Sequence, residues 1–154
     1  MSPSAVEVLL ADDNPADAEL IMHSLGEAIV GRIYHVHDGE EALDFLLCRA
    51  AYAKRSFEAP PKLIVLDIKL PKVSGLEVLE EIKRDPRTRA IPTVLLTSSR
   101  LAEDVVRGYQ LGANSFVQKP VQFERFREVV RQVGGYWLAV NEAGPPRVVG
   151  GRSR

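Results

Sequence analysis

Short apolar runs alternate along the chain with longer segments in which apolar residues recur every three or four positions. The runs are four to six residues long and predict β-strands at 6–11, 33–37, 62–67, 93–97 and 115–118. The third run, KLIVLD, contains four consecutive apolar residues, which is typical of a central parallel strand buried on both faces. The segment before it, at 51–61, is charged and aromatic, closes with two prolines and predicts a loop.

Each apolar run is followed by a segment with the periodicity of an amphipathic helix. The first of these begins with Asn14 as N-cap and Pro15 in the first turn, where Asp17 suits the positive end of the helix dipole. Capping boxes are predicted at two later helix starts, by Asp38 with Glu41 and by Ser74 with Glu77.

Two further helices are predicted at about 101–111 and 122–139. The order of elements is therefore strand then helix, five times over. Such alternation implies a parallel sheet with helices on both faces. Ligands of these sheets bind outside the carboxyl ends of the strands, so the residues at those ends indicate the function.

Composition narrows the possible functions. The 154 residues are 45% hydrophobic and carry a net charge of −1, which suits one domain and leaves no positive excess for a nucleic-acid surface. The lone Cys48 allows no internal disulfide and favours a reducing compartment. No apolar run approaches the ~20 residues of a membrane span, and the chain opens without a secretory signal. We therefore expect a cytoplasmic protein that binds neither nucleic acid nor membranes.

Reactive side chains stand at the ends of four of the five predicted strands: Asp12 and Asp13, then Asp67, then Thr97 and Ser98, then Lys119. Three carboxylates at one edge of a sheet repel each other, and a hard divalent cation such as Mg²⁺ relieves that repulsion. A metal beside an ammonium and a hydroxyl group meets the electrostatic needs of phosphoryl transfer, in which an Asp carboxylate can act as the nucleophile.

Four segments at these strand ends resemble the signature of the response regulator receiver domain of two-component signalling. They are Ala11-Asp12-Asp13-Asn14, Leu66–Pro71 with Gly75, Leu96-Thr97-Ser98, and Gln118-Lys119-Pro120. The resemblance covers about residues 5–140. It implies an α/β fold, flavodoxin-like and doubly wound, with a five-stranded parallel sheet in the order 2-1-3-4-5 and five helices.

The resemblance also implies a metal site and a partner. Asp13 is expected to bind Mg²⁺ directly and Asp12 through a metal-bound water, with Asp67 and the backbone carbonyl of Lys69 completing the protein ligands. The expected partner is a sensor histidine kinase that donates its phosphoryl group to Asp67.

Further roles follow from the same resemblance. Thr97 is expected to hydrogen-bond one phosphoryl oxygen and Lys119 to pair with another, with a cis bond between Lys119 and Pro120 aiming the ammonium. Thr97 and Phe116 are the expected switch residues. Because Phe116 has no hydroxyl group, its part in a switch rests on packing alone.

A narrower resemblance links the chain to stand-alone response regulators that partner bacterial phytochromes. It rests on the loop at 51–61, the DNPAD start of the first helix and the Gly135–Leu138 end of the last. Residues 141–154 are rich in Gly, Pro and Arg and predict a disordered tail. We expect no DNA-binding output domain, so the signal must pass through a protein–protein contact.

The last helix carries apolar residues at alternating spacings of three and four: Phe123, Phe126, Val130, Val133 and Trp137. We interpret this seam as the interface of a homodimer. The glycine pair 134–135 predicts that the helix bends or ends there.

Other functions remain open at this point. A receiver could relay its phosphoryl group onward or serve as a phosphate sink. A Mg²⁺-dependent aspartyl-phosphate hydrolase usually carries a second Asp two residues after the nucleophile, and this chain has Lys69 there. A mere scaffold is disfavoured because the whole set of strand-end residues is intact.

Overall fold

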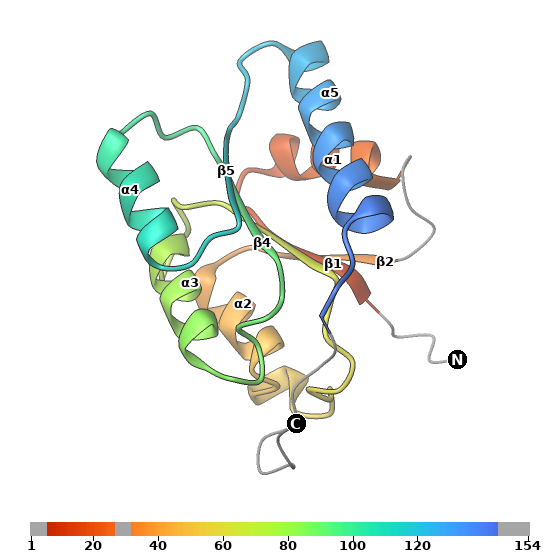
Figure 1. Ribbon diagram of the computed structural model, residues 1–154, viewed down its shortest axis with the longest axis vertical. Coiled ribbons are helices and arrows are strands. Elements are labelled where there is room, and N and C mark those ends of the chain that lie inside the picture. The colour runs from red at the N-terminus through yellow and green to blue at the C-terminus, as the bar shows by residue number, and fades with distance from the viewer. Residues whose placement is uncertain (1–5, 27–31, 145–154) are drawn as a thin grey trace.

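Five parallel strands form a single sheet in the order β2-β1-β3-β4-β5 (Figure 1), which confirms the order implied by the family resemblance. The computed structural model describes residues 6–26 and 32–144. The strands are β1 (Val6–Ala11), β2 (Arg32–Val36), β3 (Leu63–Leu66), β4 (Thr93–Thr97) and β5 (Ser115–Gln118). Every residue of β3 and β4 is buried, which agrees with their place at the centre of the sheet.

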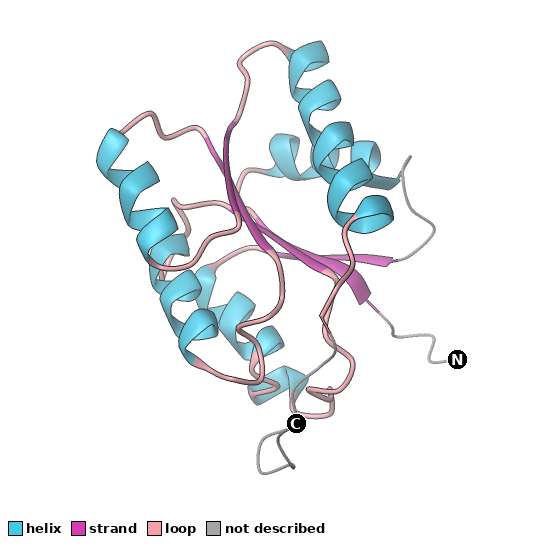
Figure 2. Cartoon of the chain, viewed as in Figure 1, coloured by secondary structure: helices cyan, strands magenta, loops and turns pink. Residues whose placement is uncertain are grey.

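The helices lie on both faces of the sheet, with α1 and α5 on one face and α2, α3 and α4 on the other (Figures 1 and 2). They are α1 (Pro15–Gly26), α2 (Gly39–Leu46), α3 (Gly75–Arg84), α4 (Ala102–Gln110) and α5 (Phe123–Gly134). A short 3₁₀ helix η1 (Ala50–Tyr52) follows α2, and a π-helical turn η2 (Gly135–Val140) continues α5. In the part of the chain that the structure describes, no helix is both long and apolar enough to cross a membrane.

Two apolar cores form because successive strand residues point to opposite faces of the sheet. In β1, Leu9 and Ala11 face the core under α2 and α3, whereas Val8 and Leu10 face the core under α1 and α5. This alternation holds the strands in a register that brings their carboxyl ends to one edge.

The helix starts follow the predicted caps with one difference. Ser74 Oγ accepts from Glu77 N at 3.2 Å and Glu77 Oε1 accepts from Ser74 N at 3.0 Å, which is a complete capping box. Asp38 accepts from Glu41 N at 2.7 Å, but the Glu41 carboxylate accepts from His37 N rather than from Asp38 N. The predicted capping box of Asp38 and Glu41 is therefore wrong in one of its two hydrogen bonds, the one from Asp38 N to the Glu41 carboxylate.

The predicted dimer seam on α5 is largely internal. Phe126 is 5% exposed and Val130 is 1% exposed, and both belong to the core between α5 and the sheet. Val133 and Trp137 pack partly against the same core. The assignment of Phe126 and Val130 to an interface is thus wrong, because the sheet and α1 cover these two side chains. Phe123 remains 59% exposed.

The last α-helix ends at the glycine pair 134–135, as the sequence predicts. The α-helical hydrogen bonding ends at Gly134, and Gly135 keeps a helical backbone as η2 begins. Residues 141–144 carry no helix or strand, and the rest of the predicted disordered tail lies outside the described residues.

Candidate functional site

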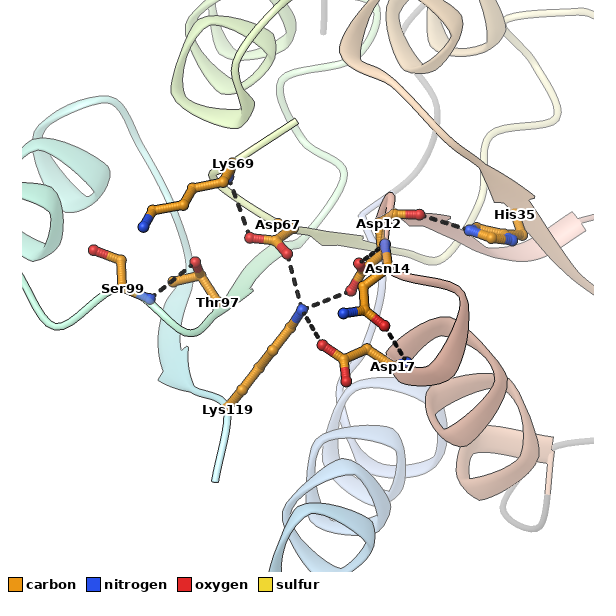
Figure 3. Close-up of polar contacts among 9 residues, drawn as sticks. All are labelled: Asp12, Asn14, Asp17, His35, Asp67, Lys69, Thr97, Ser99 and Lys119. Atoms are coloured by element: carbon orange, nitrogen blue, oxygen red, sulfur yellow. Dashed lines mark hydrogen bonds and ion pairs between the residues drawn. The ribbon is translucent and has the colours of Figure 1, made fainter. Parts of the chain in front are cut away.

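The carboxyl ends of β1, β3 and β5 bring three of the predicted site residues together (Figure 3). Asp12 follows β1 and Asp67 follows β3, and these strands are neighbours whose last residues, Ala11 and Leu66, are in register. Asp67 N donates to Ala11 O at 3.0 Å, so the ladder extends to the phosphoacceptor candidate itself. Both carboxylates are buried.

Lys119 enters this pocket from the end of β5 and contacts three carboxylates. Its Nζ donates to Asp12 Oδ2 at 2.8 Å, to Asp67 Oδ2 at 2.8 Å and to Asp17 Oδ2 at 2.9 Å. Its backbone N donates to Thr97 O at 2.7 Å, which places the base of the side chain beside β4. An ammonium has three N–H groups, so all of them are engaged.

The charge of this cluster is set by opposing effects. Burial disfavours the charge on Lys119, but the hydrogen bonds to the three carboxylates outweigh it and raise the pKa of the ammonium. Burial also raises the pKa of Asp12, and the hydrogen bonds from Lys119 and Asn14 N offset only part of that effect. Lys119 therefore stays protonated throughout the physiological pH range.

An acidic cluster next to the ammonium can hold a divalent cation. Asp12, Asp13 and Asp67 each offer a carboxylate oxygen, and these oxygens lie within 4.8 Å of one another. Three hard oxygen donors on one side fit a cation such as Mg²⁺ or Mn²⁺. Asp13 is exposed whereas the other two are buried, so the site opens to solvent on the Asp13 side.

The predicted cis bond before Pro120 is wrong, because none of the described peptide bonds is cis. The ammonium of Lys119 nevertheless reaches Asp12 and Asp67 at 2.8 Å each. A lysine side chain has four rotatable bonds, and its length alone supplies the reach that the cis bond was expected to give.

Thr97 and Phe116 lie where the sequence predicts, at the end of β4 and within β5. Thr97 is fully buried, and its Oγ1 accepts from Ser99 N at 3.2 Å. Ser99 Oγ in turn donates to Asp104 Oδ2 at 2.5 Å, so a polar chain leads from Thr97 into α4. Phe116 is half-buried against the core under α4. Their switch role remains a prediction.

Two residues of the site are not predicted from the sequence. Asp17, which the sequence indicates only as a helix-dipole residue, is the third acceptor of Lys119. His35, which lies within the second predicted strand, donates from Nε2 to the backbone carbonyl of Asp12 at 2.7 Å. Asp17 could have been found, because the first turn of a helix that follows a strand end lies directly over that end. His35 had no such signal.

Gly75 fixes the loop that carries Asp67. A Cβ at Gly75 would lie 2.0 Å from Asp67 O and 2.7 Å from Ile68 Cα, so the backbone leaves room for glycine alone. We expect Gly75→Ala to lower the free energy of unfolding by about 1–3 kcal/mol, because the loop must shift. Urea unfolding measures this. The matched control is Gly135→Ala, where an added Cβ would meet no heavy atom within 4 Å beyond its chain neighbours and its own helix backbone.

The control is expected to leave stability unchanged or to raise it by about 0.4–1 kcal/mol. If the two variants unfolded at the same urea concentration, the close approach of Gly75 to the Asp67 carbonyl would carry no energetic weight.

Comparison with known proteins adds evidence independent of this geometry. A family model described as "Response regulator receiver domain" matches residues 8–131. A similar protein of known sequence is the probable methanogenesis regulatory protein FilR2 of Methanothrix harundinacea. It is 40% identical over 140 residues, which cover 90% of this chain and 88% of FilR2.

Solved structures of two further proteins are similar in both fold and length. The phosphorylated cyanobacterial phytochrome response regulator RcpA is 34% identical with a TM-score of 0.85, over 91% of this chain and 99% of the RcpA chain. The Mn²⁺-bound form of response regulator Rcp1, a Synechocystis protein, is 33% identical with a TM-score of 0.84. That match covers 89% of this chain and 97% of the Rcp1 chain.

Proposed function

The chain belongs to the family of response regulator receiver domains, which are signalling proteins, and we propose that it accepts a phosphoryl group on Asp67 from a sensor histidine kinase. The observation that carries this proposal is the contact between Lys119 Nζ and Asp67 Oδ2, at 2.8 Å, beside an acidic cluster suited to a divalent cation. A buried ammonium next to a candidate nucleophile is what an incoming phosphoryl group requires.

The proposed step is an in-line displacement at phosphorus. A carboxylate oxygen of Asp67 forms a P–O bond while the P–N bond of the kinase phosphohistidine breaks. The electron pair of the P–N bond returns to the imidazole nitrogen, and the ring, which takes up one proton from solvent, leaves as neutral imidazole. In this step we assign the Lys119 ammonium and the Thr97 hydroxyl group as hydrogen-bond donors to the phosphoryl oxygens.

We include Mg²⁺ in the proposal, held by Asp12, Asp13, Asp67 and the backbone carbonyl of Lys69. The fit rests on the clustered carboxylate oxygens, and the Mn²⁺-bound form of the relative Rcp1 supports a divalent cation. When bound, the cation would neutralise charge that builds up on the phosphoryl oxygens. Every other group that we propose to act in the pocket is a residue of this chain.

A phytochrome-class kinase is the partner that we propose. The support is the similarity to RcpA, a cyanobacterial phytochrome response regulator, over almost the whole of both chains. The phosphoryl group received on Asp67 would then alter the contacts that this domain makes with another protein. An aspartyl-phosphate hydrolase is the less favoured function, since Lys69 stands where such enzymes usually carry a second acid.

Intact-protein mass spectrometry tests the proposal directly. After incubation with acetyl phosphate and Mg²⁺, we expect one phosphoryl adduct per chain. The adduct should be absent when EDTA replaces Mg²⁺, and hydroxylamine should remove it, because hydroxylamine cleaves acyl phosphates. Steady consumption of the donor without an adduct would favour the hydrolase, and no reaction under any condition would favour a scaffold.

A further inference from the structure

Asp17 is a member of the pocket to which the proposed function assigns no role. Its Oδ2 accepts from Lys119 Nζ at 2.9 Å, a distance equal within 0.1 Å to those of the two carboxylates at the strand ends. It comes from the first turn of α1, not from a strand end (Figure 3). Its side chain is 29% exposed, compared with 1% for Asp12 and 8% for Asp67.

The three acceptors of Lys119 change unequally during phosphoryl transfer. Asp67 loses its negative charge when one of its oxygens bonds to phosphorus, and it becomes a weaker hydrogen-bond acceptor. The N–H that pointed at Asp67 is then the nearest donor to the new phosphoryl oxygens. Asp12 and Asp17 keep their charge throughout. Two of the three N–H groups can therefore stay where they are while the third changes partner.

The two lasting acceptors are tied together by the loop between β1 and α1. Asn14 N donates to Asp12 Oδ1 at 2.9 Å, and Asn14 Oδ1 accepts from Asp17 N at 3.0 Å. This chain of contacts links the Asp12 carboxylate to the backbone from which the Asp17 side chain extends. The positive end of the α1 dipole also favours the charge on Asp17. The pair therefore forms a two-point anchor for the ammonium.

With Asp12 alone, the ammonium would keep one fixed contact and could rotate about it. Lysine side chains are flexible and their torsions are restrained mainly by what they contact. A second anchor fixes the direction of the remaining N–H. We propose that Asp17 is a positioning residue that holds the Lys119 ammonium in place while Asp67 is phosphorylated. The inference rests on the proposed function and deepens it by naming what orients the ammonium.

Substitutions at Asp17 separate its role as an acceptor from its charge. Asp17→Ala removes both, whereas Asp17→Asn keeps an oxygen acceptor of the same reach and removes only the charge. Glu19→Gln is the matched control, because it removes one negative charge from an exposed position on the same helix, away from the pocket contacts. The rate of adduct formation with acetyl phosphate at saturating Mg²⁺ is the first measurement.

We expect Asp17→Ala to react about threefold to tenfold more slowly than the wild-type chain, as befits one lost hydrogen bond to an ammonium. Asp17→Asn should recover most of that loss, and Glu19→Gln should stay within about twofold of the wild-type rate. Mg²⁺ affinity, measured by calorimetry, should change equally in the Ala and Asn variants, since both lose the same charge. A role confined to folding or to charge would not make the Ala variant slower than the Asn variant while the Mg²⁺ affinities of the two stayed equal.

Several results would overturn the inference. They are an Asp17→Ala rate equal to the wild-type rate, equal rates for the Ala and Asn variants, or a control that slows as much as they do. Urea unfolding of each variant shows whether a slow rate reflects an unfolded chain. Asp17→Asn, the milder change, provides a comparison with a chain that remains folded. Failure of the proposed function has a different signature, because the wild-type chain itself would then form no adduct.

Discussion

Asp67→Asn is expected to abolish the phosphoryl adduct that the wild-type chain forms with acetyl phosphate and Mg²⁺. The amide has no nucleophilic oxygen of comparable strength, while its size and its place at the end of β3 are unchanged. Loss of one carboxylate from an acidic cluster also relieves repulsion, so the variant should unfold within about 1 kcal/mol of the wild-type chain. Intact-protein mass and urea unfolding, run side by side, measure the two effects.

The matched control is Asp44→Asn on α2. Asp44 faces Arg49 at 3.5 Å and lies outside the pocket, so the same chemical change there should leave the adduct intact. An adduct on the Asp67→Asn chain would move the phosphoacceptor to another carboxylate, and Asp12 or Asp13 would be the first to examine by peptide mapping.

Lys119→Met is expected to have the largest effect on stability. The side chain is 6% exposed, and its ammonium is the shared partner of the buried carboxylates of Asp12 and Asp67, which would lose that partner. Breaking such a buried pair from one side costs about 3 kcal/mol in EDTA, and added Mg²⁺ should restore part of the loss. Adduct formation should slow roughly a hundredfold, as when one donor to a developing negative charge is removed.

The pH dependence of the Lys119→Met variant has a definite sign. Burial already raises the pKa of Asp12, and the loss of Lys119 removes a contact that lowers it, so the pKa rises further. The folded chain then binds a proton at Asp12 more tightly than the unfolded chain does. Its stability deficit is therefore full above the folded pKa and shrinks as the pH falls toward the ordinary value of 3.8.

Urea unfolding at neutral and at mildly acidic pH, both in EDTA, checks this dependence. Lys62→Met is the control, since Lys62 pairs with Glu7 at 3.3 Å but is 52% exposed. An exposed pair of this kind is worth less than about 1 kcal/mol. A Lys119→Met chain as stable as the wild type at neutral pH in EDTA would contradict the expected cost.

Much of the fold and of the site follows from local sequence signals. The strands β1 and β5 have the predicted bounds, and the Ser74 capping box closes as predicted, because apolar periodicity and capping depend on residues a few positions apart. The strand-end acidic residues and Lys119 are placed at one edge by the order of elements alone, since parallel strands end on the same side. Neither prediction depends on which helix covers which face of the sheet.

The tertiary structure decided what depends on neighbours distant in the chain. The apolar seam of α5 is equally compatible with an interface and with a core, and only its packing against the sheet and α1 identifies Phe126 and Val130 as core. The contact of Asp17 with Lys119 depends on how α1 lies beside the end of β5, because the two residues are 102 positions apart in the chain. By itself, then, the sequence determined that the strand-end carboxylates and the Lys119 ammonium meet at the sheet edge, through periodicity and strand ends. Which partners each group contacts was decided by the packing of α1 and β5 around them, because burial and hydrogen-bond geometry exist only once the elements are assembled.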